Sequence, residues 1–417
     1  MNTSNEMTLH EDTWIFRYIF ISALVTLVLR NIFTSTSSDK FIIVRVLQTL
    51  RTVARWMPAG FTLFYVKIII YVASTSGKCP SIDLTNCTCS TSHTAYRVNK
   101  FSAPPAPRVT LRCQKVNDVK ALTKLFRALQ GNQIDAVHIL DSPIGPSIPA
   151  NLFSGLPLSE VTLSGVDISA LSSPDSTPFL GLEQTLISLA LRRCNMRADM
   201  TLEKLTALDH IEQIDLSYNI LRFLRRRWFS VPPSSLRSLI LKGNRIEAIE
   251  SLALHNVYEL VFLDLSENRI CSLQRTMFPD KLEILHLENN RLTDLEDDLF
   301  ASMLRLRRLY LANNRIHTLK HSTFSPVWFK IQPSLEEVDV RGNPVICDCL
   351  MSWLSETIVL WRNSRTLLGY CSAPSAFVGD QLRGLDCFKL RCFNANCTQL
   401  VPNRSEDSSN YDPRTVN

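Results

Sequence analysis

Apolar residues recur with a regular spacing along the middle of this 417-residue chain. The template is L-x-x-L-x-L-x-x-N-x-L, and one clear copy is Leu260-x-x-Leu263-x-Leu265-x-x-Asn268-x-Ile270. The alternating part of the template predicts a short strand with every second side chain pointing into the core. The asparagine side chain is expected to turn inward and to hydrogen-bond backbone groups where the chain leaves the strand. One such unit cannot bury its own apolar residues, so neighbouring units must stack.

Nine copies of the pattern are present, and they start at Ile134, Leu158, Leu186, Ile211, Leu236, Leu260, Leu282, Leu306 and Leu335. The successive starts are 24, 28, 25, 25, 24, 22, 24 and 29 residues apart. In the first three copies the asparagine position holds Ser142, Val166 and Cys194. The pattern predicts an α/β solenoid of about nine coils, with a parallel sheet on its concave face.

The 12 cysteines are concentrated at the two ends of this repeat region. A solenoid exposes apolar core at each end, so the two clusters predict disulfide-bonded caps and an oxidising compartment. The cysteines expected to be bonded are Cys79, Cys87, Cys89, Cys113, Cys347, Cys349, Cys371, Cys387, Cys392 and Cys397. The remaining two, Cys194 and Cys271, lie three coils apart, or about 14 Å at the usual strand spacing. That exceeds the reach of a disulfide, so both are expected to be free thiols, with Cys194 buried.

The repeats together with the two caps resemble extracellular leucine-rich-repeat proteins with cysteine-flanked ends, the broad class that includes Slit, Toll ectodomains and chaoptin. The resemblance rests on the repeats and on the back cap, which runs from Asn343-Pro344 through Cys347-Asp348-Cys349. A narrower resemblance is carried by residues 117–129, 131–135 and 148–153. It is to the arthropod group that includes the non-catalytic subunit of a shrimp luciferase.

The wider resemblance also implies how the cap cysteines pair: Cys79–Cys89, Cys87–Cys113, Cys347–Cys371 and Cys349–Cys387. Sequence alone permits other connectivities. Cys392 and Cys397 are additional to the pattern of the class, and we expect them to pair with each other. Competition between Cys392 and Cys387 for the same partner remains open.

The resulting segments are a signal peptide or signal-anchor leader (1–78), an N-terminal cysteine cap (79–113), leucine-rich repeats (114–345), a C-terminal cysteine cap (346–397) and a polar tail (398–417). In the leader, an apolar run at 61–73 follows Arg51 and Arg55 and precedes small residues, which is the order of a secretory signal. Translation from Met57, an uncleaved signal anchor and a buried helix are the alternatives. Any contact with a membrane would be made by this segment if it is uncleaved. Sequons predict N-glycosylation at Asn86, Asn396 and Asn403.

The net charge of +6 belongs mostly to the leader, which holds eight basic and four acidic residues. The rest of the chain carries about +2 by difference, so no nucleic-acid-binding surface is predicted. A basic run on the convex side predicts contact with a glycosaminoglycan at Arg225, Arg226 and Arg227, and a solvated face is the alternative.

Catalytic motifs are not evident in the sequence. No Gly-x-Ser-x-Gly elbow or phosphate-binding loop is present, and His317 and His321 lack the glutamate of a zinc protease motif. Solvated loop residues are the simpler interpretation of these histidines. We therefore predict a protein that is not an enzyme and that uses no metal or cofactor.

The outward-pointing strand positions form columns across the predicted sheet. An apolar and aromatic cluster with a charged rim extends over four adjacent repeats and comprises Ile240, Phe262, Ile284, His286, Arg308 and Tyr310. Such a cluster is typical of a protein-binding hot spot, unless loops or a dimer partner cover it.

These features predict an extracellular recognition or adhesion protein that binds a protein ligand on its concave face. The alternative is a non-catalytic subunit that stabilises an enzyme in a secreted complex. The chain is expected to be secreted or, if the leader is uncleaved, to be anchored in a membrane with the repeats outside the cell.

Overall fold

The computed structural model describes residues 79–92, 108–172, 176–197, 202–326, 335–354, 367–385, 389–390 and 392. The leader (1–78), the polar tail and the predicted sites Asn396 and Asn403 lie outside the described residues, as do Cys387 and Cys397. The chain divides into two compact units. The first comprises Met1–Ile82, Thr88–Leu111 and Gly131–Asp135, and the second comprises Asp83–Cys87, Arg112–Gln130 and Ala136–Asn417.

The described part of the first unit contains a disulfide and a pair of hydrogen bonds between Val109 and Asp135. Cys79 is bonded to Cys89, with Cα atoms 5.6 Å apart. The Asp135 backbone N–H donates to the Val109 carbonyl oxygen at 2.9 Å, and the Val109 N–H donates to an Asp135 carboxylate oxygen at 2.6 Å.

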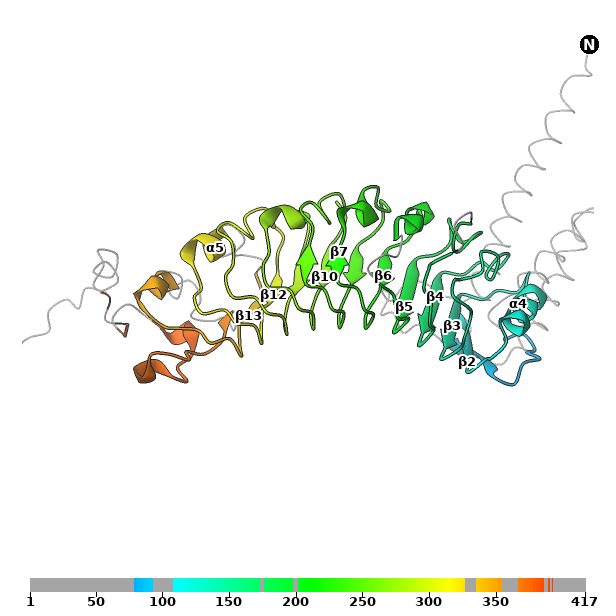
Figure 1. Cartoon of the computed structure of the whole chain (residues 1–417), viewed down its shortest axis with the longest axis horizontal. Helices are drawn as coiled ribbons and strands as arrows, with labels where there is room; N and C mark the ends of the chain where they lie inside the picture. Colours follow the sequence, from blue (N-terminus) through cyan, green and yellow to red (C-terminus); the bar gives the residue numbers. More distant parts are fainter. Residues whose placement is uncertain are drawn as a thin grey trace, which may run out of the picture. The chain divides into compact units, whose positions relative to one another are not determined.

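The second unit is a coil whose strands pair side by side in parallel. Strand order follows chain order from β3 to β13, leaving out β7 and β9, and β14 (Leu367–Leu368) extends the sheet beyond β13. The bounds are β3 (Ala136–Leu140), β4 (Glu160–Ser164), β5 (Ser188–Arg192), β6 (Gln213–Asp215), β8 (Ser238–Ile240), β10 (Phe262–Asp264), β11 (Ile284–His286), β12 (Arg308–Tyr310) and β13 (Glu337–Asp339). Figure 1 shows these strands standing side by side, with α5 (His321–Ser325) along the opposite edge of the coil. One strand falls in each of the nine predicted copies, so the predicted solenoid with its parallel sheet is confirmed.

Short helices and irregular turns return the chain between strands. They are η2 (Leu202–Ala207), η3 (Arg226–Phe229), η4 (Arg275–Met277) and α5, and a separate pair of strands, β7 (Phe223–Leu224) and β9 (Ala248–Ile249), lies among them. Earlier in the chain come β1 (Cys87–Ser92), β2 (Arg108–Gln114) and the helix α4 (Val119–Ala128). Helix α4 begins where the Asp118 carboxylate accepts from the Lys120 N–H at 2.8 Å, and it buries Leu122, Leu125 and Phe126.

The core follows the alternation of the template. In β10, Leu263 is fully buried, whereas its neighbours Phe262 and Asp264 are partly exposed. On the side away from the sheet, Phe126, Phe153 and Phe179 stack in series, with ring centroids 5.8 and 6.0 Å apart. Each coil therefore buries its apolar residues against its neighbours, as the stacking argument requires.

The asparagine position forms a hydrogen-bonded ladder inside the coil. The Asn268 side-chain amide donates to the carbonyl oxygens of Leu241 and Leu265, both at 3.0 Å. Its own oxygen accepts from the Ile246 N–H at 3.0 Å. The same arrangement recurs at Asn219, Asn244, Asn290, Asn314 and Asn343. Each asparagine thus joins its own coil to the preceding one through backbone groups that water cannot reach.

The residue before each asparagine takes a left-handed backbone conformation, which turns the chain inward. The φ angle is +66° at Gly243 and +55° at Glu267. A Cβ atom at Gly243 would lie 2.4 Å from the Tyr218 ring, so both the turn and the close packing favour glycine there.

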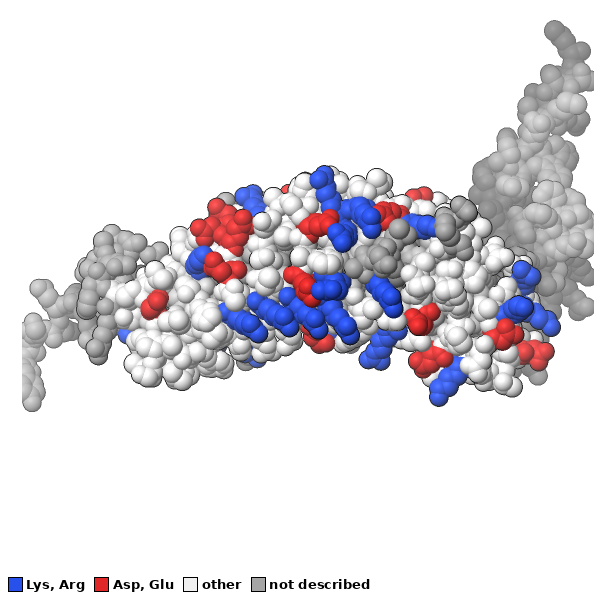
Figure 2. All heavy atoms as spheres, in the orientation of Figure 1, with Lys and Arg blue, Asp and Glu red and all other residues white. Residues whose placement is uncertain are grey.

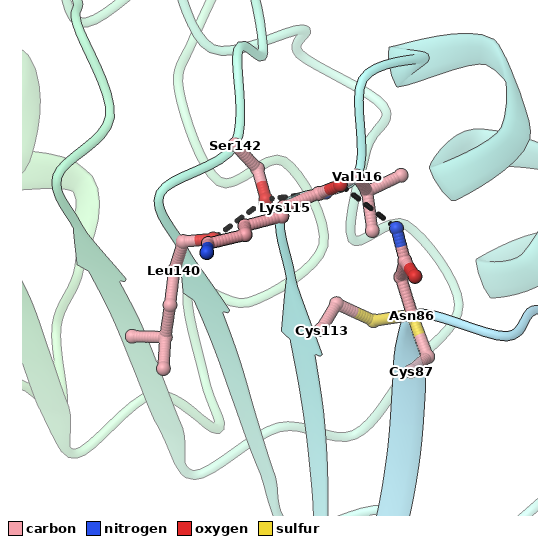
Figure 3. The surroundings of a disulfide bond; sticks show 7 residues. All are labelled: Asn86, Cys87, Cys113, Lys115, Val116, Leu140 and Ser142. Atoms are coloured by element: carbon pink, nitrogen blue, oxygen red, sulfur yellow. Dashed lines mark hydrogen bonds between the residues drawn. A yellow bond between two sulfur atoms is a disulfide. The ribbon is translucent and has the colours of Figure 1, made fainter.

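The front cap of the second unit contains the Cys87–Cys113 disulfide, with Cα atoms 4.0 Å apart (Figure 3). Beside it the Asn86 side-chain amide donates to the Lys115 carbonyl oxygen at 2.8 Å. The asparagine position of the first repeat is filled by Ser142, whose hydroxyl accepts from the Val116 N–H at 3.0 Å. In the first coil, the shorter serine side chain therefore makes a backbone hydrogen bond at the asparagine position.

The back cap contains Cys347–Cys371, with Cα atoms 5.6 Å apart, and the short helices η6 (Cys349–Met351), η7 (Ser375–Phe377) and η8 (Leu382–Gly384). The Trp353 indole N–H donates to the Leu319 carbonyl oxygen at 3.0 Å and ties the cap to the last coils. Both front pairings and Cys347–Cys371 agree with those that the resemblance implies.

One implied disulfide is wrong. Cys349 bonds to Cys392, with Cα atoms 5.5 Å apart, and not to Cys387, so the expected Cys392–Cys397 pair is also wrong. Leu390 and Cys392 are both buried, so the cap chain folds back far enough to bring Cys392 to Cys349. The entropic cost of closing the loop from Cys349 is nearly the same for Cys387 as for Cys392, so the spacing in the sequence does not select between these two partners.

Two cysteines in the described coils are free thiols, as the distance argument predicts: Cys194 is buried and Cys271 is exposed. Burial raises the pKa of the Cys194 thiol to about 12. Because the thiolate is the reactive form, Cys194 stays protonated and unreactive at pH 8.5. We expect a maleimide to label Cys271 in the native protein and to label Cys194 at least about 100-fold more slowly. Peptide mass mapping at timed intervals measures both rates, and equally fast labelling of Cys194 would contradict this environment.

Candidate functional site

Three rings from adjacent strands form a continuous row on the sheet surface. Phe262 (β10) and His286 (β11) have ring centroids 5.5 Å apart, and His286 stacks on Tyr310 (β12) at 4.4 Å with an interplanar angle of 19°. We call Phe262, His286 and Tyr310 the aromatic row. Parallel strand pairing places Phe262 opposite Ile284 and His286 directly opposite Tyr310, so the row steps diagonally from β10 to β11 and then straight across to β12.

The other apolar members of the predicted cluster flank this row. Ile284 lies between Phe262 and Arg308 in the strand register. Ile240 lies opposite Asp264, at the β8 edge of the cluster. All of the apolar and aromatic members are partly exposed. The structure therefore brings the six predicted residues onto four neighbouring strands of one face.

Two glutamates hold the polar ends of the rings. His286 Nδ1 lies 2.7 Å from a Glu288 carboxylate oxygen, and the Tyr310 hydroxyl donates to Glu337 at 3.1 Å. Partial burial, together with the Glu337 charge, raises the pKa of Tyr310. The phenol therefore stays neutral and continues to donate at physiological pH.

Arg308 is part of an ionic network at the rim of the cluster. Its guanidinium Nε lies 2.7 Å from a Glu336 carboxylate oxygen, and Arg307 pairs with the same carboxylate. Arg307 and, to a lesser degree, Arg308 lower the pKa of Glu336. The charged rim predicted from Arg308 alone is thus a group of three side chains with alternating charge.

Glu288, Glu336 and Glu337 are the members of this surface that sequence reasoning missed. Glu337 occupies an outward strand position opposite Arg308 in the register, so the column pattern contains its signal. Glu288 lies two residues beyond His286 and past the end of β11, but it continues the alternation around the buried Leu287, so the pattern contains its signal as well.

The basic run predicted to contact a glycosaminoglycan is internally paired. Arg225 lies 2.9 Å from Glu250, and Arg227 lies 3.4 Å from Glu203. The Arg226 backbone N–H donates to Glu250 and is the largest cause of that carboxylate's lowered pKa. Much of the positive charge of this run is therefore balanced within the coil.

The other residues singled out in the sequence, Asn86 and His321, make contacts within the coil and its caps. The exposed Asn86 amide is hydrogen-bonded within the cap, and its glycosylation stays a prediction. His321 packs edge-on against Trp353, with ring centroids 5.6 Å apart. In the described segments, no group of three or more His, Cys, Asp or Glu side chains is placed to hold a metal ion. None of the helices within those same segments has both the length and the apolar character needed to span a membrane.

These features define a leucine-rich-repeat protein whose coil carries disulfide-bonded ends. A sequence model described as leucine rich repeat matches residues 280–345. Similar proteins include P-granule-associated novel protein 1 of Caenorhabditis elegans, 32% identical over 159 residues, which are 36% of this chain and 26% of that protein. Toll-like receptor 7 of Drosophila melanogaster is 31% identical over 130 residues, which are 30% of this chain and 9% of the receptor.

The matched region spans about a quarter or less of these curated relatives. Among solved structures, a chain of the octameric complex of Latrophilin 3, Unc5D and FLRT2 (LRR) aligns with a TM-score of 0.51 and 18% identity. The alignment covers 68% of this chain and 90% of that chain. At this identity the likeness concerns the fold alone.

Proposed function

We propose that this chain is an extracellular, non-enzymatic recognition protein that binds a protein ligand through the sheet surface around the aromatic row. The observation that carries the proposal is the row itself, Phe262–His286–Tyr310, whose neighbouring rings pack against each other across three adjacent strands. Aromatic residues surrounded by a polar and charged rim are enriched among the residues that dominate protein-binding energy.

The scaffold beneath the row supports this role. Leu263, Leu285 and Leu309, which lie between the outward positions, are fully buried and fix the three strands. Ring stacking and the carboxylate contacts limit the rotation of the outward side chains. A surface that is ordered before binding loses less conformational entropy when the ligand docks.

The disulfides favour a location outside the cell, because such bonds persist in oxidising compartments. The predicted leader would deliver the chain there, either by cleavage or as a membrane anchor. The relative named Toll-like receptor 7, a receptor by name, supports protein recognition as the role of the coil.

The test is a double substitution at the two ends of the row. The labelled full chain is screened against purified secreted and cell-surface proteins, and the affinity for the selected ligand is then measured by surface plasmon resonance. We expect Phe262→Ala with Tyr310→Ala to weaken binding by about 100-fold, since hot-spot aromatic residues dominate such interfaces.

The matched control removes exposed apolar side chains elsewhere on the coil. Val231 is 71% exposed and Tyr258 is 62% exposed, so Val231→Ala with Tyr258→Ala should leave affinity within about threefold. Unchanged binding by the aromatic-row variant would show that the ligand docks elsewhere. Selection of an enzyme that co-purifies in stoichiometric amount would favour the role of a non-catalytic subunit.

A further inference from the structure

Four arginines occupy equivalent positions in four consecutive coils, each directly after the ladder asparagine. They are Arg245, Arg269, Arg291 and Arg315, all exposed, and we call them the arginine ladder. Figure 2 shows a row of Lys and Arg side chains crossing successive coils in the middle of the molecule. This set lies apart in sequence from the basic run at residues 225–227.

Backbone hydrogen bonds set the spacing of the ladder. The Arg269 N–H donates to the Ile246 carbonyl oxygen at 2.9 Å, and Ile246 directly follows Arg245. Equivalent bonds join Arg291 to Ile270 at 2.9 Å and Arg315 to Leu292 at 2.8 Å. Consecutive arginine backbones are therefore about 5 Å apart, and the ladder is about 15 Å long.

The carboxylates near the ladder are mostly engaged by other cations. Glu247 lies 3.1 Å from Arg222, Glu267 lies 3.0 Å from Lys242, and Asp294 lies 2.9 Å from Lys320. The ladder's own contact with a carboxylate is a long one, 3.8 Å between Arg269 and Glu247.

Within the described residues, Arg245, Arg291 and Arg315 form no ion pair. The ladder therefore presents positive charge that the coil does not balance, unlike Arg225 and Arg227, which are paired with glutamates.

We propose that the arginine ladder is a binding site for a linear sulfated polysaccharide. Guanidinium groups bind sulfate oxygens as they bind phosphate, through two parallel N–H donors. A single file of guanidinium groups about 5 Å apart fits one extended chain of anionic groups. The polysaccharide would lie across the coils, parallel to the direction in which they stack.

Other polyanions fit this surface less well. Duplex DNA presents phosphates from two strands and is bound by a broader basic surface. Single-stranded nucleic acid is bound through stacking on aromatic side chains. The positions two residues before and two residues after the ladder contain no Phe, Tyr or Trp, and they are Gly243, Glu267, Asn289, Asn313, Glu247, Cys271, Thr293 and His317. The exposed Tyr218 ring packs against Gly243, but at one end of the ladder, so it does not form a series of stacking platforms along it. The disulfides also point to the extracellular space, where sulfated polysaccharides are the abundant polyanions.

The experiment compares heparin binding by the full chain and by two matched variants, each lacking four arginines. The ladder variant changes Arg245, Arg269, Arg291 and Arg315 to Gln, and the control changes Arg222, Arg225, Arg226 and Arg227 to Gln. Exposed ion pairs each contribute modestly, so losing four contacts predicts binding about tenfold to 100-fold weaker at 0.15 M NaCl for the ladder variant. The control variant should bind within about threefold of the wild type.

Two further arms make the result specific. A variant with Lys at the four ladder positions keeps the charge and should retain most of the binding, whereas desulfated heparin should bind weakly to the wild type. Thermal unfolding confirms that each variant is folded. Loss of binding in the control variant but not in the ladder variant would overturn the proposal. So would duplex DNA binding as tightly as heparin, or no heparin binding by the wild type.

Discussion

Replacing Asn268 by alanine is expected to lower the free energy of unfolding by about 4 kcal/mol. The side chain accepts from the N–H of Ile246 and donates to the carbonyl oxygens of Leu241 and Leu265, with the Ser266 carbonyl oxygen as a further acceptor. Each buried group left without a partner costs about 1–3 kcal/mol, because alanine can neither accept nor donate. Urea unfolding followed by tryptophan fluorescence and by circular dichroism measures the loss.

Asn256→Ala is the matched control for this substitution. The Asn256 side chain makes two exposed hydrogen bonds: its amide donates to the Ser230 carbonyl oxygen at 3.1 Å, and its oxygen accepts from the Tyr258 hydroxyl at 3.3 Å. Water can replace both partners, so their removal should cost about 1 kcal/mol or less. A loss below about 1.5 kcal/mol for Asn268→Ala would show that water replaces the side chain in the core. In that case the asparagine ladder would not be what joins neighbouring coils.

Removing the Cys347–Cys371 disulfide is expected to be the second most destabilising change. The bond closes a loop with a sequence separation of 24 residues. The chain-entropy model assigns about 3 kcal/mol to a loop of that size. The disulfide also holds the cap over the last coil, where Met351 and Leu382 are fully buried. Cys347→Ala with Cys371→Ala should therefore lower the unfolding free energy by about 3 kcal/mol and expose the end of the coil to proteolysis.

Cys271→Ala is the control for the loss of sulfur. Cys271 is exposed and unbonded, so its replacement should change stability by less than about 0.5 kcal/mol. Limited proteolysis with peptide mapping locates the segment that opens. Initial cleavage of the double variant far from residues 340–392 would contradict a local role of this disulfide in sealing the coil.

Much of the candidate surface could be predicted before the structure was known, because strand positions are periodic. The column pattern selected Phe262, His286 and Tyr310, and parallel pairing then placed them on adjacent strands. Their stacking could not be predicted, since it depends on side-chain torsions. The carboxylate contacts of His286 and Tyr310 depend on side-chain torsions as well.

The sequence by itself determined the coil. Leucines at fixed positions must be buried, and a buried strand exit needs a polar side chain, so the strands and the asparagine ladder follow from local spacing. Tertiary structure decided which groups meet where no repeat applies. Arg225 and Arg227 are paired with glutamates from neighbouring coils, whereas Arg245, Arg291 and Arg315 form no ion pair with the residues that the structure describes. Cys349 bonds to Cys392 because the cap chain folds back that far. Periodic burial specifies which equivalent positions of neighbouring coils touch. It does not specify which cysteines pair across loops of similar closure entropy, or which carboxylate a long arginine side chain reaches, because both depend on the three-dimensional path of the chain.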